Sequence, residues 1–206
     1  NLSILHKNRV AGKLSVAGRI GWIITLAIVL FVVVSIHTAT GQVKVYRQPL
    51  TLPAYGVEEP EIMPDWRQYR YPYTMYDRLS NKKGIKEYDA LYVENEYVKA
   101  LVLPEIGGRL HGATDKTNGY EFLYDQKVIK PGLISTTGAW ISGGVEWNFP
   151  IGHRPTCFRE TDWHMTENPD GSKTAWTGEI DRMTGMRWSV GTTVYPERNW
   201  VETKIR

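Results

Sequence analysis

Cysteine is nearly absent from this sequence: Cys157 is the single one among 206 residues. A lone cysteine cannot form a disulfide within the chain, and it cannot supply the thiolates of a structural zinc site. The histidines and carboxylates also lack the tight spacing of a zinc site, since the Asp162-x-His164 pair near His153 is the best that the sequence offers. We therefore expect a small buried thiol, no metal ion and no cofactor.

Acidic residues are missing from the first 41 positions. This segment contains Lys7, Arg9, Lys13 and Arg19, so it carries +4, and the remaining residues carry −1 of the total formal charge of +3. The basic character of the chain thus belongs to its beginning and not to the part that folds. Without a basic patch in the folded part, the sequence excludes a nucleic-acid partner.

Charge of either sign is missing from residues 20–36, a run of apolar side chains followed by the small and polar residues HTATGQ. A basic start, an apolar stretch and small residues are the layout of a secretory signal. An uncleaved membrane anchor is the alternative, because the run is at the short end of what spans a hydrocarbon core of ~30 Å. Both alternatives predict one hydrophobic N-terminal helix in residues 1–41 and an exported domain that is periplasmic, at the cell surface or secreted.

Proline is concentrated between residues 42 and 72, at positions 49, 53, 60, 64 and 72. Such a segment cannot form a long helix or a central strand. We predict an extended arm over residues 42–85, rich in proline and tyrosine, with one short edge strand at residues 43–47.

From residue 86 onward, short runs rich in β-branched and aromatic residues alternate with turn sequences, which predicts a β-domain over residues 86–206. The expected strands are 88–94, 97–103, 109–114, 121–124, 162–167, 173–181, 186–195 and 200–206. Strands at this spacing indicate an all-β fold, an antiparallel sandwich or barrel. The last of them reaches the final residue without a closing element, so we expect the sandwich to be incomplete at Arg206.

The segment at residues 138–155, GAWISGGVEWNFPIGHRP, has neither helical nor strand periodicity. Trp140 and Trp147 offer flat apolar faces, and polar side chains lie between and after them. Flat faces beside hydrogen-bonding groups suit a sugar ring, which has apolar C–H patches and a fringe of hydroxyls. We predict that this segment is an open saccharide-binding loop.

Five polar residues are candidates for that site, each with a structural alternative. His153 can exchange a proton near neutral pH or have a purely structural role. Glu146 can act with it as an acid or base, and the structural alternative for Glu146 is an ion pair with Arg154 or Arg109. Asn148 can bind a sugar hydroxyl or cap a turn. The guanidinium groups of Arg109 and Arg154 can bind sugar oxygens or a carboxylate.

Four motifs occur in one order: LYVENEY at residues 91–97, LPEIGGRL at 103–110, DKTNG at 115–119, and the segment at 138–155. Together they resemble the secreted bacterial family called domain of unknown function 5107, which is itself similar to the galactose mutarotase-like, or aldose 1-epimerase-like, superfamily. The resemblance runs from about residue 50 to the end of the chain.

The resemblance implies a mutarotase-like β-sandwich that handles carbohydrate, with Arg109 in contact with substrate. In mutarotases a histidine and a carboxylate act as acid and base, and the carboxylate base is expected beyond Arg206. Glycoside hydrolysis and epimerisation both stay open, because one scaffold serves several reactions. A different class stays open too: a non-catalytic surface module that presents downstream repeats to protein partners.

Overall fold

A computed structural model describes residues 41–58, 72–124, 126–150, 152–154 and 156–206. The chain divides into two compact units, Asn1–Thr40 and Gly41–Arg206, and only the second is described below. The hydrophobic helix expected at residues 20–36 lies outside the described residues. Among the residues that are described, no helix is long and apolar enough to cross a membrane.

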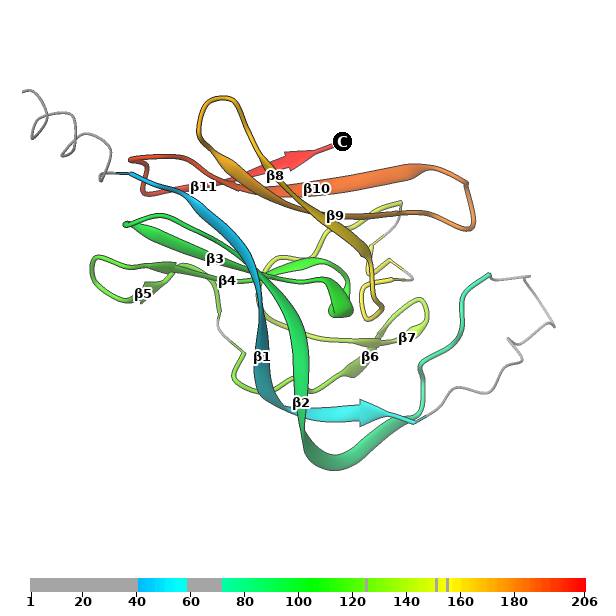
Figure 1. The fold of residues 1–206 in the computed structure, drawn as a ribbon. Helices are drawn as coiled ribbons and strands as arrows, with labels where there is room; N and C mark the ends of the chain where they lie inside the picture. Colours follow the sequence, from blue (N-terminus) through cyan, green and yellow to red (C-terminus); the bar gives the residue numbers. More distant parts are fainter. Residues whose placement is uncertain (1–40, 59–71, 125, 151, 155) are drawn as a thin grey trace, which may run out of the picture. The chain divides into compact units, whose positions relative to one another are not determined.

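The described residues form an all-β, antiparallel fold, as the sequence predicts. Its elements are β1 (Lys44–Val57), β2 (Leu79–Glu94), β3 (Val98–Leu103), a 3-10 turn η1 (Pro104–Ile106), β4 (Arg109–Asp115), β5 (Tyr120–Glu121), β6 (Gly132–Ser135), β7 (Gly138–Trp140), β8 (Asp162–Glu167), β9 (Lys173–Ile180), β10 (Arg187–Val194) and β11 (Val201–Ile205). One sheet has the order β1-β2-β3-β4-β5, a second has the order β11-β10-β9-β8, and β6 pairs with β7 (Figure 1).

Strand β1 is longer than the short strand expected at residues 43–47, and β2 begins nine residues before the position expected. The two strands form a long antiparallel ribbon in which Pro49 faces Asp89 and Pro53 faces Ile85. Proline lacks an N–H and is tolerated in a strand at the edge of a sheet. Strand β1 is an edge strand of its sheet, and on its second side Pro53 uses only its carbonyl, which accepts from the amide of Ile129 at 2.9 Å.

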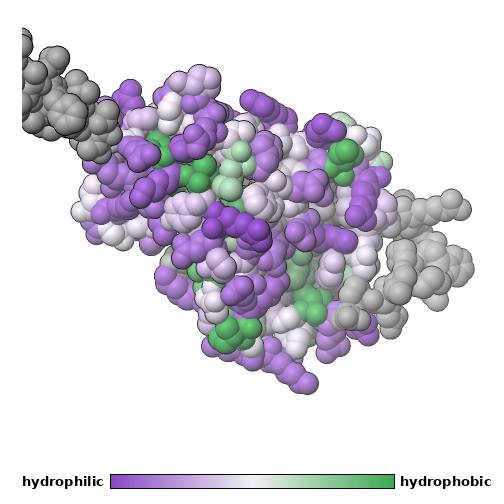
Figure 2. Space-filling model, viewed as in Figure 1, coloured by the Kyte–Doolittle hydropathy of each residue, from purple (hydrophilic) through white to green (hydrophobic). Residues whose placement is uncertain are grey.

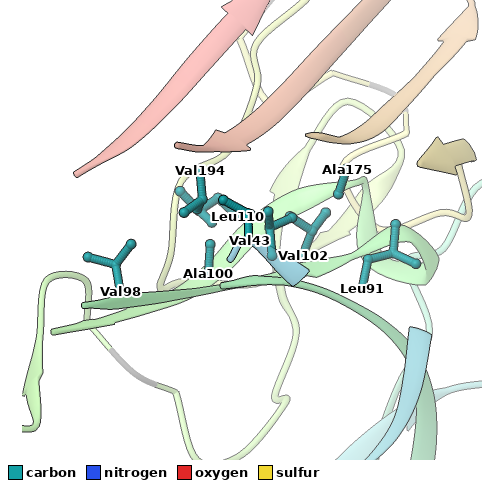
Figure 3. Packing of buried hydrophobic residues seen from close by; sticks show 9 residues of the cluster. Val43, Leu91, Val98, Ala100, Val102, Leu110, Ala175 and Val194 are labelled. Atoms are coloured by element: carbon teal, nitrogen blue, oxygen red, sulfur yellow. The ribbon is translucent and has the colours of Figure 1, made fainter. Parts of the chain in front are cut away.

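The main hydrophobic core lies between the two large sheets. Figure 3 shows Val98, Ala100 and Val102 of β3 directed toward the layer that carries Ala175 of β9 and Val194 of β10. Val43, Leu91, Val93 and Leu110 complete the same cluster. Period-2 alternation along each strand places one set of side chains in this layer, and their burial is the main stabilising term.

A second cluster covers the opposite face of the β1–β5 sheet. Tyr88, Ala90 and Tyr92 of β2 pack there with Ile129 and Ile141 from the segments around β6 and β7. The C-terminal half of β2 is therefore buried on both faces, which explains why its sequence reads as a nearly continuous apolar run.

The face of the domain seen in Figure 2 is mainly hydrophilic, and its apolar side chains form small separate patches. Scattered apolar side chains of this kind are ordinary on protein surfaces. Polar and aromatic clusters on the described residues are therefore more informative about function than this apolar surface.

Candidate functional site

The segment at residues 138–155 is fastened to strand β4 by a backbone bridge. The amide of Val145 donates to the carbonyl of Leu110 at 2.8 Å. The preceding residue, Gly144, has φ 62°, and a Cβ at that position would lie 2.3 Å from the Leu110 oxygen. Only glycine fits this approach, so the Gly-Gly pair in the sequence serves to bring the segment against β4.

Arg109, the first residue of β4, holds the same segment from inside the domain. Its Nη1 donates to the carbonyls of Ile141 at 3.0 Å and Gly143 at 2.8 Å, and its Nη2 lies 3.6 Å from Glu146 Oε2. Burial lowers the pKa of Arg109 below its usual value, and the charge of Glu146 partly offsets this. Arg109 is thus a buried positioning residue that fixes the loop and supplies a positive charge behind Glu146.

Glu146 is the centre of the cluster. The indole N–H of Trp140 donates to Glu146 Oε2, and Nδ1 of His153 lies 3.4 Å from Oε1 and from Oε2. The Glu146 side chain is 13% exposed, whereas that of His153 is 43% exposed. Oε1 is buried and accepts no hydrogen bond from the described residues. A nearly buried carboxylate therefore lies beneath a histidine that solvent can reach.

His153 has an unusual backbone conformation, with φ 49° in the left-handed region. Its N–H donates to Oδ1 of Asn148 at 2.8 Å, its carbonyl accepts from the amide of Thr136 at 3.4 Å, and its ring meets Trp140 edge-on at 5.5 Å. Such a conformation costs a non-glycine residue about 1 kcal/mol or more, so it persists only where surrounding contacts impose it. Asn148 has the turn-capping role that was the structural alternative for it.

Trp147 and Arg154 depart from the expectation that they line an open cleft. The Trp147 ring packs against the main core, and its N–H donates to the carbonyl of Gly108 at 3.1 Å. Arg154 is fully buried, donates to the carbonyl of Gly107, and stacks over the Trp188 ring at 4.0 Å. Burial lowers its pKa to about 10, and these contacts make it part of the interior framework.

Other sequence candidates lie apart from this cluster. His164 of β8 is stacked beside Trp176 of β9, with ring centroids at 6.0 Å, and Asp162 two residues earlier on β8 is exposed. Among the described residues, no group of three or more His, Cys, Asp or Glu side chains has a geometry that could hold a metal ion. Sequence reasoning missed Gln126, whose side chain donates to Ser142 Oγ at 2.5 Å and supports the loop from another segment.

The fold and the site define an antiparallel β-sandwich domain with a loop-borne Glu146–His153 pair on the first sheet. A family model described as domain of unknown function, DUF5107, matches residues 67–205, and the chain belongs to this family. The resemblance inferred from the four sequence motifs is therefore confirmed at the level of the family.

A solved structure gives a second comparison: the crystal structure of a TPR-domain containing protein from Parabacteroides distasonis ATCC 8503, at 2.26 Å resolution. The similarity has a TM-score of 0.72 at 27% sequence identity and covers 81% of this chain. It covers 29% of that protein, so this chain spans less than a third of the length of its relative.

Proposed function

We propose that this domain is an exported carbohydrate-binding module of mutarotase-like type, and that the Glu146–His153 pair on the 138–155 loop contacts the sugar. The observation that carries the proposal is the accessible His153 ring placed 3.4 Å from the Glu146 carboxylate, with Trp140 beside both. An imidazole and an indole edge offer a sugar one hydrogen-bonding group and one apolar surface. Export rests on the apolar run at residues 20–36 and its basic flank.

The chemistry open to the pair is proton exchange with one sugar hydroxyl. Glu146 holds the imidazole through Nδ1, which leaves Nε2 to donate to or accept from a ligand. Hydrolysis or epimerisation of a sugar needs a second acid or base on the other side of the anomeric carbon. The pair by itself can bind and orient a sugar, so the proposed function is binding.

Titration of the full chain with neutral and acidic mono- and disaccharides, followed by calorimetry, tests this proposal. We expect binding that weakens about tenfold or more in His153→Ala and in Glu146→Gln, because each loses a hydrogen bond to a charged group. His164→Ala is the matched control, since this histidine is also exposed but lies on β8. Binding that is equal in all variants would remove the pair from the site.

A second function, in a different class, is favoured by the comparison with the TPR-domain containing protein, of which this chain resembles a part. In this alternative the sandwich is a non-catalytic module that supports a larger surface assembly and binds protein partners. A cross-linking experiment on intact cells distinguishes the two functions. Recovery of the same protein partners by wild type and by His153→Ala, without saccharide binding by either, supports the assembly module.

A further inference from the structure

A separate polar cavity of about 370 Å³ lies where residues 72–76, the 156–160 loop and the end of the β9–β10 hairpin meet. The residues that line it are Tyr73, Tyr76, Lys86, Glu105, Thr156, Phe158, Arg159, Glu160, Glu179 and Arg182. None of the residues placed in the Glu146–His153 cluster is among them. The cavity therefore requires an explanation of its own.

Two arginines of this cavity are held by tyrosine rings rather than by carboxylates. The Arg159 guanidinium lies 5.0 Å from the Tyr76 ring and 5.8 Å from the Tyr73 ring, and that of Arg182 lies 5.4 Å from the Tyr73 ring. Their hydrogen bonds are long, at 3.4 Å to the carbonyls of Thr74 and Pro72. Cation–π contacts hold a guanidinium in place but leave its in-plane N–H donors available.

Three of the other charged groups of the cavity already have partners. Lys86 pairs with Glu105 at 3.0 Å, and Glu179 accepts from Thr156 and from the Trp188 indole. Within the described residues, neither Arg159 nor Arg182 has a carboxylate within ion-pair distance, and Glu160 is an exposed acid at the rim. The unsatisfied hydrogen-bonding capacity of the cavity is therefore mainly that of two cationic donors.

A second cavity, of about 390 Å³, adjoins the first and shares Tyr76, Lys86, Glu105 and Phe158 with it. Aromatic side chains are frequent in its lining, which also includes Tyr55 and Tyr88. A Cβ added at Gly56 or at Gly84 would meet no atom within 4 Å, so the backbone leaves open space on this side. The two cavities together combine a half rich in aromatic side chains with a half that contains the two arginines.

We propose that this double cavity binds an acidic saccharide, with its carboxylate or sulfate group on Arg159 and Arg182 and its sugar ring against the aromatic half. Planar guanidinium groups bind such oxyanions through paired N–H···O bonds. A single acidic group fits better than a polyanion, because residues 42–206 carry a formal charge of −1. That the ligand is a saccharide rests on the proposed function. That the saccharide is acidic rests on the two arginines.

Calorimetry on the full chain tests it with four probes: digalacturonate, N-acetylglucosamine 6-sulfate, cellobiose and sodium sulfate. We expect an acidic saccharide to bind at low salt at least tenfold more tightly than cellobiose. The affinities of the first two probes show whether the cavity prefers a carboxylate or a sulfate group. Sodium sulfate gives the affinity of the anion without a sugar. Failure of both acidic saccharides to bind at millimolar concentration, or equal binding of cellobiose, overturns the inference.

Variants connect the binding to the cavity. Arg159→Gln and Arg182→Gln should each weaken the acidic saccharide about tenfold, and Arg159→Lys should restore only part of the loss because a lysine lacks the fork. Arg187→Gln is the matched control, since Arg187 is exposed on β10 and lies outside both cavities. Thermal unfolding of each variant verifies that it is folded. Arg182 is exposed, so its replacement should disturb folding less than replacement of Arg159.

The same variants separate this inference from the proposed site. Binding lost in Arg159→Gln and Arg182→Gln but unchanged in His153→Ala supports the double cavity and contradicts the Glu146–His153 site. Binding lost in His153→Ala alone supports the Glu146–His153 site and contradicts the double cavity. Acidic saccharide binding that is reduced in both sets supports both sites on one extended ligand.

Discussion

Nδ1 of His153 lies 3.4 Å from both carboxylate oxygens of Glu146, and the buried Arg109 approaches the same carboxylate at 3.6 Å. Replacement of the carboxylate by an amide leaves the Arg109 charge without its counter-charge in the interior. We expect Glu146→Gln to lower the free energy of unfolding by about 2 kcal/mol, measured by urea denaturation. Glu160→Gln, at an exposed acid, should change it by less than about 0.5 kcal/mol. Equal stability of the two variants would contradict the structural role of Glu146.

Gly144→Ala should destabilise the domain and displace the loop. The new Cβ would lie 2.3 Å from the Leu110 carbonyl oxygen, in a residue with φ 62°. Gly119 also has a positive φ, 76°, but nothing lies within 4 Å of a Cβ there. Gly119→Ala therefore reports the backbone cost alone, about 1 kcal/mol, and Gly144→Ala should exceed it by at least ~1 kcal/mol in thermal or urea unfolding. A smaller loss in Gly144→Ala than in Gly119→Ala would show that β4 and the loop do not approach this closely.

Cys157 should not react with thiol reagents in the native domain. The thiol is 1% exposed, and burial raises its pKa to about 11. Since the thiolate is the reactive form, labelling at pH 8 should proceed only through opening of the structure. Mass spectrometry after a short exposure to iodoacetamide should find the native protein unmodified and the urea-unfolded protein fully alkylated. Rapid labelling of the native protein would place the 156–160 loop outside the core.

Acid should weaken the attachment of residues 72–76 to the β9–β10 hairpin. Burial alone would raise the pKa of Asp181, but hydrogen bonds from Thr184 and Tyr73 outweigh it and hold the pKa below its usual value. A lowered pKa means that the stabilisation is complete above the usual aspartate pKa and is lost as the pH falls through the lowered value. The loss is therefore expected below about pH 4.

Tyr73→Phe tests this acid dependence. The variant should be less stable than wild type by about 1 kcal/mol at pH 7, and the difference should shrink below about pH 4. Tyr76→Phe serves as the control, because the Tyr76 hydroxyl makes no hydrogen bond to the described residues. A difference between wild type and Tyr73→Phe that stays constant down to pH 2 would contradict the role assigned to Asp181.

Strands β3, β4 and β8 to β11 could be predicted because their signals are local, whereas β6 and β7 were not expected. Strand β8 has the expected bounds, Asp162–Glu167. Between the strands expected at 88–94 and 97–103, the turn is formed by Asn95, whose Oδ1 accepts from the amides of Tyr97 and Val98. A short polar side chain that bonds the backbone two or three residues on is enough to specify such a turn. The length of β1 was underestimated because of its prolines. A strand tolerates proline at the edge of a sheet, and the local sequence does not reveal that β1 is an edge strand.

The site was only partly predictable for the same reason. Residues 138–155 are close in sequence, so the association of Trp140, Glu146 and His153 could be expected from their composition. The burial of Arg154 depends on the Gly107 carbonyl and the Trp188 ring, each 34 or more residues away. The contacts of Arg159 with Tyr73 and Tyr76 join residues more than 80 positions apart, and no sequence pattern predicts them.

The C-terminal half of β2, packed against one cluster through Leu91 and Val93 and against the other through Ala90 and Tyr92, has protein on both sides. Backbone amides there exchange with deuterium only when both layers separate, whereas those of an edge strand such as β11 exchange through local fraying. We therefore expect this stretch of the chain to be the slowest-exchanging region of the domain, so that its protection reports the global stability.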